Sequence, residues 1–315
     1  MTLACGLPAS ASAATPGANG RLAVAKWTAP KSKKGSAGSA LISSAPDGSA
    51  LQRLFAKKRF LVDSPEYSAD GTKIAFSMGA FGRESKSDGV YVAAADGTGA
   101  KLVARTGWVD GIAWSPDGTS LVYADVMDGI HSVPSTGGTA ELIVKVLDDG
   151  GYFRRPAFTP DGATILFERN TLSSGDKPFF EVGELWKARR DGTGAGVLFP
   201  SLPMPFAGEP DVSPDGKTVV FTSLLDKRAT RSAVATVPID GSAAPRTLYT
   251  SAKNGWIDGP TWAPDGSRVA FTTGGFKKVA SSLLVLDPAT AATSTVQRAA
   301  SAQLTGPTWQ ALPAG

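Results

Sequence analysis

Carboxylates recur at one position of a repeated segment, and their spacing predicts a cluster of charge. Asp63, Asp110 and Asp258 each stand seven residues before the aspartate of a recurring Asp-Gly turn. If the repeats close into a ring, these side chains should lie together at one mouth of a central channel. Further members of this column are Arg154, Gly208 and Thr305, and the next column adds Arg155 and Glu209. Converging carboxylates can hold a cation or the amino end of a peptide, and the structural alternative is that they tie down neighbouring backbone.

Two copies of the repeat share a fuller phrase around these carboxylates. Residues 107–111 read Gly-Trp-Val-Asp-Gly, and residues 255–259 read Gly-Trp-Ile-Asp-Gly. Trp108 and Trp256 therefore stand two residues before Asp110 and Asp258. Because binding residues concentrate on loops that a rigid scaffold positions, we expect both tryptophans to join the charged residues in a surface that binds a protein or peptide partner.

The residues for catalysis are scarce. The chain has one histidine, His131, and one cysteine, Cys5, which cannot supply the three or four ligands of a zinc site. No Gly-x-Ser-x-Gly elbow offers a serine nucleophile. His131 falls in a repeated column whose other members are Ile42, Tyr91, Trp186 and Ala235. We predict a packing role for His131, no catalytic residue, no metal site and no cofactor; Ca²⁺ on the channel carboxylates is the alternative left open.

The turn that recurs along the chain predicts the fold. Five copies of a phrase ending in Asp-Gly carry their aspartates at positions 70, 117, 161, 215 and 265. Ser/Thr-Pro-Asp-Gly suits a type I turn, so these aspartates are predicted to be structural. An extended segment precedes each turn and an apolar strand such as Leu121-Val122-Tyr123 follows it, which predicts a β-hairpin. A second Asp-Gly hairpin completes each unit, and four strands per unit of this length are typical of a propeller blade.

The sixth unit is divided between the two ends of the chain. Residues 307–310, Pro-Thr-Trp-Gln, match the strand before the turn, and residues 19–27 match the strand after it. We predict an all-β, six-bladed propeller over residues 19–315, with four-stranded antiparallel blades and a ring closed by pairing of the terminal strands. Such closure removes exposed strand edges.

Composition and charge limit the remaining classes. The chain has 315 residues, a net charge of +4, 36 glycines and 22 prolines. The chain has no run of eighteen uncharged apolar residues, so the sequence predicts no transmembrane span. No Lys/Arg-rich element could read a nucleic-acid groove, so no nucleic-acid partner is expected.

The first eighteen residues differ from the repeats. Leu3–Ala14 are small and apolar, and the run Ala-Ser-Ala-Ser-Ala-Ala suits a signal-peptidase site, although no cationic residues precede it. We predict that residues 1–18 are a signal-peptide-like leader and that the protein is extracytoplasmic: periplasmic, cell-envelope or secreted. A start upstream of this sequence and a disordered leader are the alternatives.

Loops expected on the same face as the channel mouth are rich in cations. They contribute Lys31, Lys33, Lys34, Arg83, Lys86, Lys227, Arg228, Arg231, Lys277 and Lys278, and another loop adds Phe179 and Phe180. A basic rim around an acidic mouth would favour an anionic or mixed-charge partner; the alternative is a solvated face.

The recurring phrase, for example Pro-Thr-Trp-Ala-Pro-Asp-Gly at 260–266, resembles the repeats of TolB-like propellers, a branch of the WD-repeat-like class, whose mark is Pro-x-Trp-Ser-Pro-Asp-Gly followed by Ile-Ala-Phe. The resemblance covers residues 19–312 and implies a periplasmic, non-enzymatic scaffold that binds a protein partner in the cell envelope. TolB carries an additional N-terminal domain that this sequence lacks. We expect a monomer that binds a partner at the channel mouth. The alternative is a carbohydrate- or small-ligand-active propeller, lyase- or hydrolase-like, that uses the channel carboxylates; a sensor propeller is a third.

Overall fold

The recurring turns are built as their sequence predicts. In the computed structural model, Gly118 N donates to Ser115 O at 2.8 Å, and the Asp117 carboxylate accepts from Ser115 Oγ at 2.6 Å. Gly118 has a φ of +68°, which glycine adopts without the strain that a side chain would add. The structure describes residues 17–29, 38–80, 85–172, 181–200, 206–225, 230–275 and 278–313. The structural role predicted for the turn aspartates is confirmed.

The described residues form 24 strands in six sheets. Blade 1 comprises β24 (Gln303–Leu312), β1 (Ala18–Thr28), β2 (Gly38–Ser44) and β3 (Gln52–Ala56). Blade 2 comprises β4 (Phe60–Tyr67), β5 (Lys73–Ala80), β6 (Gly89–Ala94) and β7 (Lys101–Arg105). Blade 3 comprises β8 (Val109–Trp114), β9 (Ser120–Asp125), β10 (Gly129–Pro134) and β11 (Glu141–Lys145).

The second half of the ring repeats this plan. Blade 4 comprises β12 (Tyr152–Phe158), β13 (Thr164–Leu172), β14 (Glu181–Arg189) and β15 (Gly196–Val197). Blade 5 comprises β16 (Ala207–Val212), β17 (Thr218–Leu224), β18 (Ser232–Pro238) and β19 (Arg246–Thr250). Blade 6 comprises β20 (Gly255–Trp262), β21 (Val269–Gly275), β22 (Lys278–Leu286) and β23 (Thr293–Ala299). The shortest of these strands is β15, which has two residues.

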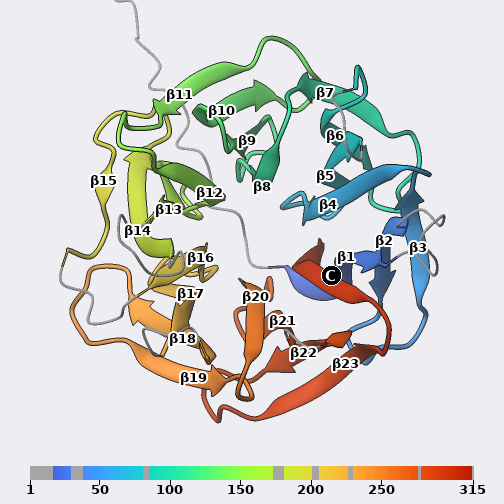
Figure 1. Cartoon of the computed structure of the whole chain (residues 1–315), viewed down its shortest axis with the longest axis vertical. Coiled ribbons are helices and arrows are strands. Elements are labelled where there is room, and N and C mark those ends of the chain that lie inside the picture. The colour runs from blue at the N-terminus through green and yellow to red at the C-terminus, as the bar shows by residue number, and fades with distance from the viewer. Residues whose placement is uncertain are drawn as a thin grey trace, which may run out of the picture.

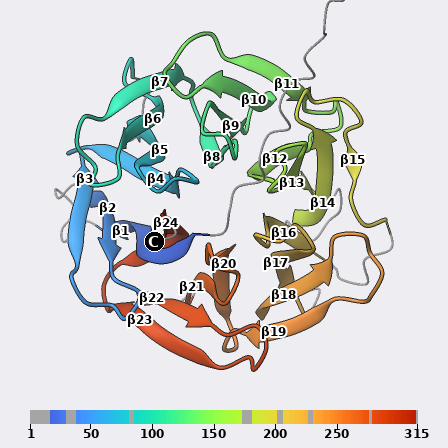
Figure 2. The same cartoon turned by 180° about the vertical axis from the view of Figure 1, so that it is seen from behind.

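Blade 1 closes the ring. The last strand, β24, pairs antiparallel with the first strand, β1, with Leu22 opposite Trp309 and Ala25 opposite Thr305. Figure 2 shows β24 on the channel side of its blade beside β1, with β2 and β3 farther out. The predicted six-bladed propeller and its closure between the terminal strands are confirmed.

The hydrophobic core is divided among the seams between neighbouring blades. One aromatic residue in the second strand of five blades is fully buried, at 0 or 1% exposure: Phe76, Tyr123, Phe167, Phe221 and Phe271. Each packs with residues of an adjacent blade; Phe76, for example, shares a cluster with Leu41 of blade 1. This packing fixes the six inner strands β24, β4, β8, β12, β16 and β20 around the channel (Figure 1). None of the described segments forms a helix long and apolar enough to cross a membrane.

Candidate functional site at the channel mouth

All six inner strands contain the same irregularity. Their pairing with the second strand shifts register, for example between Asp63 and Glu66 and between Asp258 and Thr261. At each shift one residue has a φ between +48° and +101°: Ser64, Gly111, Arg155, Glu209, Gly259 and Gly306. The predicted column of charged residues lies immediately before this bulge. It therefore lies inside the inner strands.

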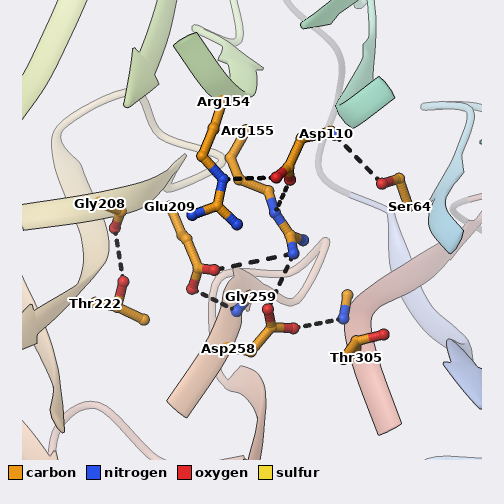
Figure 3. Close-up of polar contacts among 12 residues, drawn as sticks. Ser64, Asp110, Arg154, Arg155, Gly208, Glu209, Thr222, Asp258, Gly259 and Thr305 are labelled. Atoms are coloured by element: carbon orange, nitrogen blue, oxygen red, sulfur yellow. Dashed lines mark hydrogen bonds and ion pairs between the residues drawn. The ribbon is translucent and has the colours of Figure 1, made fainter. Parts of the chain in front are cut away.

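The bulges aim side chains of two successive positions at the channel. In blade 4 both positions are arginines, because Arg154 belongs to the charged column and Arg155 occupies the left-handed position. Figure 3 shows the two guanidinium groups side by side, facing Asp110 of blade 3. A non-glycine residue in this conformation costs about 1–2 kcal/mol, so other contacts must hold Arg155 there.

Those contacts are ion pairs to three other blades. Arg154 Nε lies 2.6 Å from Asp110 Oδ2, and Arg155 Nε lies 3.0 Å from Asp110 Oδ1. Arg155 Nη2 lies 2.9 Å from Asp258 Oδ1 and 3.9 Å from Glu209 Oε1 (Figure 3). The structure therefore brings together four of the predicted site residues, Asp110, Arg154, Glu209 and Asp258, around Arg155.

Polar contacts continue around the whole ring at this level. Glu209 Oε2 accepts from Gly259 N at 2.8 Å, and Asp258 Oδ2 accepts from Gly306 N at 2.7 Å. Asp63, the fifth predicted residue, accepts from Thr305 Oγ1 at 3.2 Å. Ser64 Oγ accepts from Gly111 N at 3.3 Å, and Glu168 accepts from Glu209 N at 3.0 Å. Every pair of neighbouring blades is thus joined by at least one polar contact next to the bulges.

The acids of this ring differ in the direction of their pKa shifts because their electrostatic surroundings differ. Burial alone would raise the pKa of Asp110, but the charges of Arg155 and Arg154 outweigh it and lower that pKa. Burial and the nearby charge of Asp258 raise the pKa of Glu209 to about 8. Burial also raises the pKa of Asp63. The arginines therefore hold Asp110 ionised, whereas Glu209 binds a proton near neutral pH.

Glu168 is a member of this network that the sequence analysis missed. It lies fully buried on the second strand of blade 4, with Oε1 3.8 Å from Arg154 Nη1. In three other blades the equivalent residue is a serine or threonine whose hydroxyl donates to a carbonyl of the inner strand: Ser77, Thr222 and Thr272. A glutamate in a column of small hydroxyl residues is the signal that could have revealed it.

The two predicted tryptophans differ in exposure. Trp256 of β20 packs over Gly274 of β21, where a Cβ atom would lie 2.5 Å from its ring. Trp108 instead lies opposite Val126, whose N donates to Trp108 O at 3.0 Å. The side chain of Val126 occupies the space that Gly274 leaves free in blade 6. The Trp108 ring therefore cannot pack there as Trp256 does, and Trp108 is 66% exposed.

Other sequence predictions have different outcomes. His131 stacks on Tyr123 with ring centroids 5.2 Å apart, and its Nε2 lies 2.7 Å from Asp128 Oδ1, in keeping with a packing role. Within the described ranges, no three His, Cys, Asp or Glu side chains are grouped so that they could hold a metal ion. Most of the cationic loop residues, and Phe179 and Phe180, lie outside the described residues, as does the leader up to residue 16.

The closed ring and the blade divided between the two ends of the chain define a six-bladed β-propeller. Among solved structures the chain is similar to TolB from Acinetobacter baumannii, with a TM-score of 0.70 and 17% identity over 92% of this chain and 66% of that one. It is also similar to hydrazine synthase from Kuenenia stuttgartiensis, with a TM-score of 0.71 and 13% identity over 94% of this chain and 47% of that one. At these identities the likeness shows the fold alone.

Sequence comparison adds one curated relative. An uncharacterised protein from Agrobacterium fabrum is 26% identical over 168 residues, which are 50% of this chain and 52% of that protein. The chain thus matches about half the length of this relative. No family model matches the chain.

Proposed function

We propose that this protein is an extracytoplasmic binding scaffold that engages a protein or peptide partner on the face around the channel mouth. The observation that carries this proposal is an exposed apolar patch beside the charged mouth. Large exposed apolar groups that gather in one place typically mark interaction sites.

The patch consists of Trp108, Met127 and Leu147, which are 66, 75 and 46% exposed. Three adjoining segments of blade 3 supply these side chains. Backbone bonds join the segments, because Val126 N donates to Trp108 O and Val146 N donates to Asp128 O, both at 3.0 Å. We call this surface the blade 3 patch.

The charged mouth adjoins the blade 3 patch through the chain itself, since Trp108 is two residues from Asp110. The side chains of Asp110 and Arg154 remain 20 and 23% exposed although they pair with one another. A partner would therefore meet both signs of charge next to an apolar anchor. A mixed-charge segment with one large apolar side chain fits this surface, since charge complementarity orients a partner and a buried anchor supplies affinity.

The extracytoplasmic location rests on other support. The sequence of residues 1–18 resembles an exported leader, and the fold is that of TolB. Cell fractionation followed by N-terminal sequencing of the mature protein tests this part. Recovery of the uncut chain in the cytoplasm would contradict it.

Photocrosslinking in intact cells tests the binding face. A photoreactive amino acid at Met127 should yield a discrete crosslinked product, and Trp108→Ser should abolish it because the anchor is lost. The matched control is Leu51, which is 59% exposed on the turn between β2 and β3. The same probe at Leu51 should give no such product, and Leu51→Ser should leave the Met127 product intact.

These substitutions avoid the ion pairs of the channel, so they leave those contacts between blades in place. Equal crosslinking from Met127 and Leu51, or a Met127 product that survives Trp108→Ser, would contradict the proposed face.

A further inference from the structure

A cavity of about 280 Å³ lies in the channel beyond Arg155, on the side of the Ser/Thr-Pro-Asp-Gly turns. Arg155 and Glu209 line it at one end, and the prolines of the turns, such as Pro116 and Pro214, line it toward the other. Its ligand would therefore enter from the face opposite the channel mouth, and this site does not depend on the partner-binding face proposed above.

The wall of the cavity comes from one column of the inner strands, three residues after the mouth column. Around the ring, from blade 1 to blade 6, this column reads Thr308, Glu66, Ala113, Ala157, Asp211 and Thr261, and all six line the cavity. Glu66 of blade 2 and Asp211 of blade 5 are three blades apart and so lie on opposite sides of the channel. Two alanines occupy one flank between them, which leaves that part of the cavity unfilled.

The two acids are held differently. Asp211 Oδ2 accepts from Thr261 Oγ1 at 3.0 Å and from Trp262 N at 2.7 Å, and its Oδ1 accepts from Val212 N at 2.9 Å. These donors fix the carboxylate against the wall. Glu66 has the hydroxyl of Thr308 as its hydrogen-bond partner. Its carboxyl therefore keeps the capacity to accept from a ligand.

The charge on the cavity wall is unbalanced. Among the described residues that line the cavity, Arg155 is the one cation, and its guanidinium is already paired with Asp110, Asp258 and Glu209. None of the ion pairs among the described residues includes Glu66 or Asp211, so neither carboxylate has a cationic side chain of the protein as its partner. An anion would be repelled here, whereas a cation would gain from both carboxylates.

The lining also indicates which kind of cation fits. Trp114, Trp262 and Trp309 line the cavity next to the wall column. Their indole rings pack in the hydrophobic clusters between blades, so the carboxylates are the groups that a ligand would meet. Carboxylates suit an organic cation, which carries its own N–H donors. A metal ion would need a ligand group of three or more such side chains, which the described part of the chain does not assemble.

We propose that this cavity binds an ammonium or guanidinium group between Glu66 and Asp211. The group comes either from a small free amine or from a basic side chain of a peptide, and both sources present the same chemistry.

Binding at this site is coupled to a proton. Burial, followed by the charge of Asp211, raises the pKa of Glu66 well above its ordinary value, so in the empty cavity this acid keeps its proton to a higher pH than a glutamic acid in water does. The other charged groups that face the cavity are Arg155 and Glu209, while Asp63 lies nearby on the strand of Glu66. A bound cation favours the ionised form of Glu66, so binding releases a proton and affinity rises with pH.

Isothermal titration calorimetry of the full chain at pH 6 and pH 8 tests the proposal. The probes are putrescine and agmatine as free amines, and end-blocked peptides that contain one lysine or one arginine. 1,4-Butanediol is the uncharged control for putrescine. We expect binding of either the amines or the peptides, tighter at pH 8 than at pH 6, and none of butanediol; whichever class binds identifies the source.

Two variants make the result specific. Glu66→Gln matches the neutral acid in shape, so it should fold normally, weaken binding roughly tenfold or more and reduce both the pH dependence and the proton release, of which Glu209 keeps its own share. Ala157→Leu should block the cavity without a change in charge. Asp96→Asn on the outer surface is the matched control and should bind as the wild type does. No binding of any amine or peptide, undiminished binding by Glu66→Gln, or binding of Ca²⁺ or Mn²⁺ in place of the amines would overturn the proposal.

Discussion

Arg155 of blade 4 donates through Nη2 to Asp258 of blade 6 at 2.9 Å, and so spans the channel past the whole of blade 5. Its Nε donates to Asp110 of blade 3 at 3.0 Å. One side chain thereby fastens three inner strands, and its left-handed backbone is tolerated because this position lets the guanidinium reach the axis. The same side chain separates the channel mouth from the cavity behind it.

Replacement of Arg155 by glutamine should destabilise the ring strongly. The partly buried carboxylates of Asp110 and Asp258 would lose their shared cation, and breaking a buried ion pair from one side costs about 3–5 kcal/mol. Urea denaturation at pH 7 measures the change. The matched control is Arg268→Gln, because Arg268 pairs with Asp287 at 3.3 Å but is 45% exposed, and it should cost less than about 1 kcal/mol. Equal losses for the two variants would show that Arg155 is not a fastener.

The pH dependence of stability should report Glu209. Burial and the charge of Asp258 raise its pKa to about 8, above its value in the unfolded chain. The folded state therefore holds a proton that the unfolded state releases, so this contribution is complete at acid pH and is lost as the pH rises from about 4.5 to about 8. The slope reaches about 1.4 kcal/mol per pH unit at most.

Glu209→Gln should flatten this slope, since its amide oxygen can still accept from Gly259 N while no proton is exchanged. Denaturation at pH 5, 6.5 and 8 is the measurement. Asp117→Asn is the control: partial burial would raise the pKa of Asp117, but hydrogen bonds from Ser115 and Thr119 outweigh it and lower that pKa. Asp117→Asn should therefore change the pH dependence of stability only at lower pH. Identical slopes of stability against pH for the wild type and Glu209→Gln would refute the assignment to Glu209.

The sequence was sufficient for the fold because a repeat places equivalent residues in equivalent positions. Asp110, Arg154 and Asp258 could be assigned to one mouth on that ground alone. The sequence could not predict which of these residues pair. The ion pair between Arg155 and Asp258, for example, depends on the width of the channel and on the length of the arginine side chain. The exposure of Trp108 had a similar limit, since it depends on Val126 standing where blade 6 has Gly274.

The bulge glycines should differ in their tolerance of alanine. Gly111 and Gly306 occupy the same left-handed position in two blades, with φ of +101° and +53°. A Cβ at Gly111 would lie 2.6 Å from the Arg155 Cα, whereas at Gly306 the nearest contacts are 3.5 Å. Gly306→Ala should therefore cost only the conformational strain of about 1–2 kcal/mol, and Gly111→Ala distinctly more, as measured by the free energy of unfolding. A larger loss for Gly306→Ala would contradict this account.

Removal of β24 should abolish the native ring. A chain that ends after residue 302 lacks the inner strand of blade 1, and the edge of β1 becomes exposed. The side chains of Leu22 and Val24, each only 1% exposed in the core that β24 covers, become exposed as well. An open edge with apolar neighbours promotes association, so we expect the truncated chain to elute as oligomers in size-exclusion chromatography and to lose its cooperative thermal transition. A chain that ends after Pro313 keeps all of β24 and should behave as the full chain does.

Addition of a peptide spanning Gln303–Leu312 should restore a single transition by strand addition, because the missing strand supplies both the backbone partners and Trp309. A truncated chain that stays monomeric and melts like the full chain would show that the ring does not need this strand to hold together.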